Sequence, residues 1–274
     1  MWKCCLVTAS IVLFVAWLVP VMKKYMYYNQ RPPLNFHRAM AGLELSAFGA
    51  PPFSPIVSDA IVPLGPSCLA AYHLKRAGLR TSPYPLDWTL FDNRNEHLST
   101  LTHLFNTHFR PLVHLDTSQL YNENIALGNG TTVPSVVHQD LGIRWIHDDP
   151  LKDSSKVQRR SDILVRRLKR AHDIQLLFVV AWKARAFPAP LATFLKQIEL
   201  LLHSIDAWYD NTTVPTYQLL LVFETHPYDP HYVAMKEQIH RIDDKLIVAP
   251  ILPSVEEWGN AIGWDALMDR LKKS

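Results

Sequence analysis

The second half of the chain alternates continuous apolar runs with longer amphipathic patterns, and this alternation most constrains the fold. The apolar runs lie at residues 174–181, 217–223 and 246–249. Because they lack polar alternation, they predict strands that are buried on both faces. Helical patterns follow them, at residues 191–208, 231–242 and 255–271. Strands and helices in this order predict an α/β fold, with a largely parallel sheet and helices on both of its faces.

The same order opens the globular part of the chain. An apolar run at residues 61–64 stops at Gly65, and a helical pattern begins at Ser67, whose hydroxyl can cap it. The chain has 274 residues, of which 48% are hydrophobic, and this is enough for one sizeable core. We therefore expect a single domain over residues 57–274, with an irregular loop at residues 115–134.

An uncharged apolar segment occupies residues 4–22, after a short tail at residues 1–3. As a helix this segment spans about 28 Å, which is enough to cross a bilayer. Lys23, Lys24 and several tyrosines follow it, as expected at the lipid headgroups. A cleavable signal peptide is the alternative, but no small-x-small motif ends the segment. We predict an uncleaved single-pass anchor that contacts membrane lipid, followed by a stem at residues 23–56.

The signals for membrane orientation oppose one another. Lysines and arginines follow the apolar segment, and the positive-inside rule would then keep the domain in the cytosol. Cys4 and Cys5 instead suit palmitoylation of a cytosolic N-terminus. Glycosylation sequons begin at Asn129 and Asn211. We expect a type II protein of the endoplasmic reticulum or Golgi, whose domain is lumenal and glycosylated at these two asparagines.

The charge pattern excludes one class of partner. The formal net charge is +3, and Lys and Arg are scattered or balanced by acids through most of the chain. This argues against nucleic-acid binding. The basic helical pattern at residues 156–172 is the exception. We expect it to be a solvated helix face, and binding of phosphate or acidic lipid is the alternative.

Histidines recur through one region of the first half, at His97, His103, His108 and His114. Helical zinc ligands are spaced four residues apart, whereas these residues are five or six apart. We expect them to face solvent or to cap helices. We therefore predict no metal site and no cofactor.

Cysteine usage singles out Cys68. The chain has three cysteines, and the other two are Cys4 and Cys5, so the domain has no internal disulfide. Cys68 is expected in the first turn of a helix, where backbone N–H groups and the helix dipole favour a thiolate. It is therefore a candidate nucleophile. The alternative is a small buried residue that seals the strand-to-helix turn.

A cysteine nucleophile needs a base within hydrogen-bond reach. His147 is the first candidate, because it ends a short strand expected at residues 141–146 and precedes two acids. His226 follows a buried strand and is the alternative base. Asp87 is a candidate orienting acid, or else a turn-forming residue on a proline-rich loop. Because sites in such sheets collect at the carboxyl ends of strands, we expect Cys68 and the histidines to meet at one edge.

Four short motifs carry a family resemblance. They are LGPSC at residues 64–68, A-x-x-L at 71–74, GLR at 78–80 and PLDW at 85–88. They resemble the opening motifs of a family described as papain-like cysteine peptidases, L-G-x-x-C, A-x-x-L, G-L-R and P-F-D-W. Leu86 here replaces the usual phenylalanine. The later runs GIRWIHDD, VRRLKR and LLFVVAW are similar to that family's second block.

The resemblance implies that Cys68 is the nucleophile, that His147 is the base and that Asp87 belongs to the signature. It also implies an alternative fold, a papain-like α+β arrangement of a helical lobe against a β-barrel-like lobe. We therefore expect a membrane-anchored cysteine hydrolase that acts on a peptide or acyl substrate. A type II lumenal transferase and a non-catalytic binding domain are the alternatives.

Overall fold

The computed structural model describes residues 58–91, 96–126, 131–170, 174–182, 190–209, 217–225, 229–239, 241–252 and 261–273. These residues belong to one compact unit. They confirm the α/β class that the sequence predicts.

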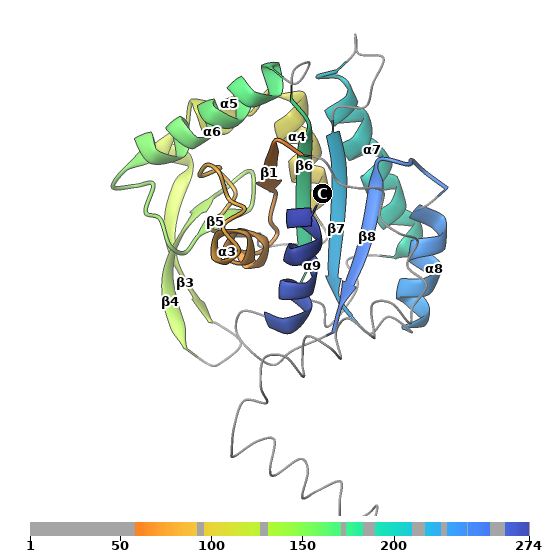
Figure 1. Ribbon diagram of the computed structural model, residues 1–274. Coiled ribbons are helices and arrows are strands. Elements are labelled where there is room, and N and C mark those ends of the chain that lie inside the picture. The colour runs from red at the N-terminus through yellow and green to blue at the C-terminus, as the bar shows by residue number, and fades with distance from the viewer. Residues whose placement is uncertain are drawn as a thin grey trace, which may run out of the picture. The chain divides into compact units, whose positions relative to one another are not determined.

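A parallel four-stranded sheet forms the centre of this unit (Figure 1). Its strands, in spatial order, are β1 (Ala60–Pro63), β6 (Leu176–Trp182), β7 (Tyr217–Glu224) and β8 (Leu246–Ile251). Each neighbouring pair is parallel. The continuous apolar runs of the sequence are therefore the strands of this sheet, and almost all of their side chains are buried.

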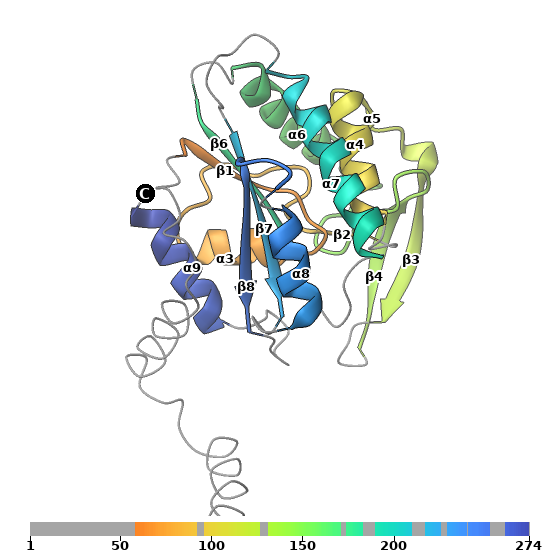
Figure 2. The ribbon, with the colours of Figure 1, turned by 90° about the vertical axis from the view of Figure 1, so that its right-hand side faces the viewer.

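Helices cover both faces of the parallel sheet (Figure 2). One face carries α3 (Leu69–Arg76) and α9 (Ala261–Lys273). The other carries α4 (His97–Asn106), α7 (Leu191–Asp206) and α8 (Pro230–Ile239), with α5 (Arg110–Val113) and α6 (Ser154–Lys169) beside them. Successive β6 side chains point to opposite faces of the sheet. Phe178 packs on the face that carries α4, α7 and α8, and Val179 packs on the face that carries α3 and α9. The prediction that helices cover both faces of the parallel sheet is confirmed.

A second sheet corrects the expectation of one largely parallel sheet. It is antiparallel, and its strands in spatial order are β2 (Thr89–Phe91), β5 (Ile143–Trp145), β4 (Thr132–His138) and β3 (Leu120–Ala126). The short 3₁₀ turn η1 (Thr117–Gln119) precedes β3. All four strands, like α4, α5 and α6, lie in the sequence between β1 and β6.

The prediction of an irregular loop at residues 115–134 is wrong, because β3 and the first three residues of β4 lie there. The sequence of β3 has no apolar alternation because residues 121–124 are all exposed. Backbone pairing with β4 holds this strand along its whole length instead. Arg144 adds a cross-strand link, since it donates to Glu123 Oε2 (2.8 Å) and to Ser135 Oγ (3.0 Å).

Two further expectations concern the architecture. A helical lobe against a β-barrel-like lobe does not describe the β1-β6-β7-β8 parallel sheet, so that alternative is wrong for this unit. The predicted anchor at residues 4–22 and stem at residues 23–56 lie outside the described residues. Among the residues that are described, no helix combines the length and apolarity that crossing a bilayer requires.

Candidate functional site

The turn from β1 into α3 lies against the carboxyl end of β6. Leu64 N–H donates to Val179 O (2.8 Å), and Ala181 N–H donates to Gly65 O (3.0 Å), so strand pairing continues past Pro63. Ser67 Oγ then donates to Ala181 O (3.3 Å). The turn that carries Cys68 is therefore fixed at the edge of the parallel sheet where ligand sites collect.

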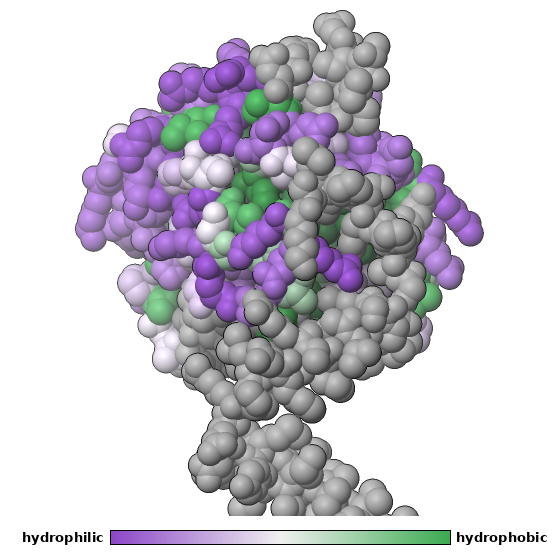
Figure 3. Space-filling view, in the orientation of Figure 1, coloured by the Kyte–Doolittle hydropathy of each residue, from purple (hydrophilic) through white to green (hydrophobic). Residues whose placement is uncertain are grey.

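Cys68 is the N-cap residue of α3 and is half-buried. The sequence predicted Ser67 as the cap, whereas the Ser67 hydroxyl accepts only a long bond of 3.5 Å from Leu69 N–H. Helical hydrogen bonding starts at Tyr72, whose N–H donates to Cys68 O (2.9 Å). In Figure 3, hydrophilic residues surround a small hydrophobic area near the position of α3. Because Cys68 is half-buried, its side chain is neither sealed in the core nor fully exposed.

His97 is buried and packs against this turn, which corrects the expectation that it faces solvent. Its Nε2 donates to Leu64 O (2.9 Å), and its ring packs edge-on against Phe91, with centroids 4.4 Å apart. Burial lowers the pKa of His97 to about 4, although the bond to Leu64 opposes this. His97 is therefore a neutral structural residue. The other three histidines, His103, His108 and His114, are exposed as expected.

Acid should destabilise the protein through His97. Its pKa is lower in the folded protein than the ordinary 6.5, so the unfolded chain binds the proton first as pH falls. Stability is then lost between pH 6.5 and pH 4, by about 2.5 kcal/mol at pH 4.5. His97→Gln keeps an N–H donor for Leu64 O and cannot titrate. Urea unfolding at pH 7 and pH 4.5 should show a smaller pH dependence in this variant, and an unchanged dependence would contradict the assignment.

His147 follows β5, so it does not stand at the end of a strand in the sheet that carries Cys68. Its ring meets Trp88 edge-on, with centroids 5.4 Å apart. Lys75 Nζ and the Arg80 guanidinium lie 5.9 Å and 5.7 Å from the same Trp88 ring. His147 is exposed, and Trp88 is half-buried between it and the end of α3. Trp88 therefore links His147 to α3.

Asp87 holds the loop that presents Trp88. The carboxylate is fully buried, pairs with Arg80 and accepts the Tyr84 N–H (2.9 Å). Burial raises the pKa of Asp87 to about 6, against the lowering effect of Arg80. The contacts described for Asp87 therefore fix residues 84–88. Its proposed role as an orienting acid for a histidine stays a prediction.

Asp148 ties the residue after His147 to the basic helix. Its carboxylate pairs with Lys156 and with Arg160 (2.5 Å) on α6. Burial alone would raise the pKa of Asp148, but the hydrogen bonds and charges of Lys156 and Arg160 lower it below its ordinary value. Two cations of the basic pattern at residues 156–172 are therefore paired with a carboxylate of the protein.

Several predicted site residues lie outside the described residues. They are His226, Asn129 and Asn211. Within the described ranges, no cluster of three or more His, Cys, Asp and Glu side chains is arranged to hold a metal ion.

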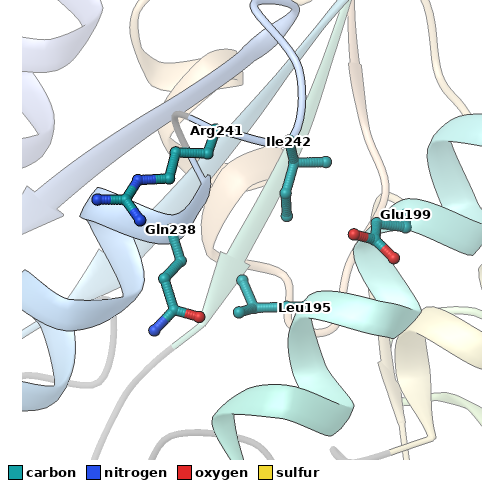
Figure 4. Close-up of a pocket in the computed structure, with 5 residues that line it drawn as sticks. All are labelled: Leu195, Glu199, Gln238, Arg241 and Ile242. Atoms are coloured by element: carbon teal, nitrogen blue, oxygen red, sulfur yellow. The ribbon is translucent and has the colours of Figure 1, made fainter.

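A surface cavity lies between α7 and α8, and it is not lined by any of the site residues described above. It has a volume of about 570 Å³. Figure 4 shows Leu195 and Glu199 of α7 on one side, and Gln238, Arg241 and Ile242 at the end of α8 on the other. None of these residues was a sequence candidate, and the lining contains one acid and one cation.

Comparison with protein-family models, with curated proteins and with solved structures finds no match to this chain. The strongest candidate for a functional site is the Cys68 turn at the carboxyl end of β1. The contact between Trp88 and His147 lies on the adjoining surface.

Proposed function

We propose that the protein is a cysteine hydrolase that uses papain-like Cys-His chemistry on a different fold, acting on a peptide or acyl substrate with Cys68 as its nucleophile. The observation that carries this proposal is the position of Cys68, a half-buried thiol at the N-cap of α3 directly after a parallel strand. Backbone N–H groups and the positive end of the helix dipole favour the thiolate there. The anchor and lumenal orientation expected from the sequence belong to the same proposal, as a membrane-bound hydrolase of the secretory pathway.

In the proposed reaction the Cys68 thiolate attacks the substrate carbonyl carbon. A C–S bond forms, and the bond to the leaving amine or alcohol breaks as a histidine protonates the leaving group. Water, deprotonated by the same histidine, then cleaves the thioester to a carboxylic acid and restores the thiol. The N–H groups of Ala70 and Ala71 precede the first helical bond, which Tyr72 makes, and they would hold the oxyanion.

His147 is the proposed base. Positions 68, 72 and 75 share one face of α3, because they are spaced by four and three residues. The Trp88 ring lies 5.9 Å from Lys75 Nζ, and His147 packs against that ring. This supports a site in which His147 approaches the face of α3 that carries Cys68. His226 is the alternative base and follows β7 in the sequence.

Alkylation of Cys68 tests the proposal. Iodoacetamide at pH 7, with the labelled site identified by mass spectrometry, should modify Cys68 in the native full-length chain faster than a model thiol. His147→Ala should slow this by about tenfold, because the thiolate loses its paired base. His103→Ala removes an exposed histidine on α4 and is the matched control. His226→Ala identifies the alternative base if it slows the reaction instead.

Two results, one from alkylation and one from a separate activity assay, would reject the proposal. If Cys68 reacts only after denaturation, the interpretation that remains is a non-catalytic binding domain. Normal turnover of a transferase substrate by Cys68→Ala would place the protein among the lumenal transferases.

A further inference from the structure

A cavity of about 380 Å³ opens on the side of α6 near the start of the parallel sheet. It is lined by Arg166, Arg167, Arg170, Asp59 and an apolar surface of Ala60, Ile163 and Ile174. Three guanidinium groups therefore face one recess, together with a single carboxylate. Guanidinium groups bind phosphate oxygens through paired N–H donors.

The cations of α6 divide into two groups. Near its start, Lys156 and Arg160 share the carboxylate of Asp148. Near its end, Arg167 donates to Ser82 Oγ (2.8 Å), and its guanidinium lies over the Tyr84 ring. These contacts orient Arg167 without neutralising it.

Arg166 and Arg170 also keep their full charge. Across the described ranges neither forms an ion pair, and Arg166 Nε donates only to the backbone carbonyl of Asp162 (3.3 Å). Asp59 contributes one negative charge to the lining, and its carboxylate also accepts the Gln175 N–H (2.7 Å). Three positive charges and one negative charge leave an excess of two in the cavity.

We propose that this cavity binds a phosphomonoester whose organic group is apolar. At neutral pH a phosphomonoester carries a charge of about −1.5 to −2, which matches the excess of the cavity. Its oxygens would be bound by Arg166 and Arg170, with Arg167 held in place by Ser82. The organic group would lie on Ile163 and Ile174. A carboxylate supplies only one charge and is the poorer match.

This site is separate from the proposed catalytic turn. Asp59 precedes β1 and Ala60 begins it, whereas Cys68 follows the opposite end of that strand. Four residues of extended chain span about 13 Å, and the turn adds to that separation. Binding in the cavity therefore needs neither Cys68 nor His147. Its test is independent of the test of hydrolysis.

Calorimetric titration of the full-length chain in a neutral detergent tests the proposal, with phenyl phosphate as the probe. We expect saturable binding at one site. Arg166→Gln/Arg170→Gln should raise the dissociation constant by at least about tenfold, since it removes two charge-assisted contacts. Arg159→Gln/Lys169→Gln makes the same charge change on exposed positions of α6 that do not line the cavity. This control should change the constant by less than about twofold.

The outcomes separate binding from general charge attraction. Equal weakening by both double variants, or no saturable binding by the native chain, would overturn the proposal. Dihexanoyl phosphatidic acid and phenyl phosphate then distinguish the sources of the ligand. Clearly tighter binding of the lipid would identify a lipid headgroup, and similar binding of both would identify a soluble phosphomonoester. Either of these two results supports the site.

Discussion

Gly65→Ala is expected to destabilise the protein by about 4 kcal/mol, since two separate costs add. Gly65 has φ +83°, a left-handed backbone conformation that side chains other than glycine rarely adopt. A Cβ atom there would lie 2.9 Å from Phe91 Cε2 and 3.3 Å from His97 Nε2. Both neighbours are buried and cannot move without disturbing the turn that carries Cys68.

Gly78→Ala provides the matched control. Gly78 has a similar φ of +73°, but a Cβ atom there would meet nothing within 4 Å. In this variant the free energy of unfolding should fall only by the backbone cost, about 1 to 2 kcal/mol. The difference between the two variants in urea unfolding then measures the steric overlap at Gly65. Equal losses would show that Phe91 and His97 do not pack closely on the turn.

Asp148→Asn is expected to lower the free energy of unfolding by about 3 to 4 kcal/mol at pH 7. The substitution keeps the shape of the side chain but leaves Arg160 without its counter-charge. Only 6% of the Asp148 side chain and 11% of the Arg160 side chain are exposed, so solvent cannot replace the lost interaction. The loop after His147 would also lose its attachment to α6.

Asp149→Asn is the control on the neighbouring residue. Asp149 pairs with Lys152, whose side chain is 85% exposed, so its loss should cost less than about 1 kcal/mol. The folded pKa of Asp148 is lowered, so its ionised form contributes stability above the unfolded pKa and loses it as pH falls. The difference between wild type and Asp148→Asn should therefore shrink below about pH 4. A deficit that persists there would contradict the ion-pair explanation.

The parallel sheet could be predicted because its sequence signal is local. Each of β6, β7 and β8 is a continuous apolar run, and burial on both faces produces that pattern directly. The antiparallel sheet could not be predicted in the same way. β3 is polar and exposed, and what makes it a strand is its pairing with β4. Such pairing leaves no periodic signal in the strand itself.

The candidate site was partly predictable for the same reason. Cys68 stands at a strand-to-helix junction, and a strand, a glycine and a helix are all visible in the sequence around it. The role of His97 was hidden, because it depends on a contact with Leu64 O across many residues of intervening chain. The pairing of Asp87 with Arg80 and the packing of Trp88 on His147 are likewise tertiary contacts without a spacing rule.

The position of β1 has a consequence for how the protein folds. Asp59 and Gln175, which link the start of β1 to the start of β6, are 116 residues apart in sequence. β6 and β7 are instead joined through α7, and β7 and β8 through α8, so their pairing closes much shorter loops. Because closing long loops is entropically costly and slow, we expect β1 to join a sheet whose other strands already pair. The Cys68 turn is then completed last, so its thiol acquires its helix-terminal environment only when the rest of the domain has folded.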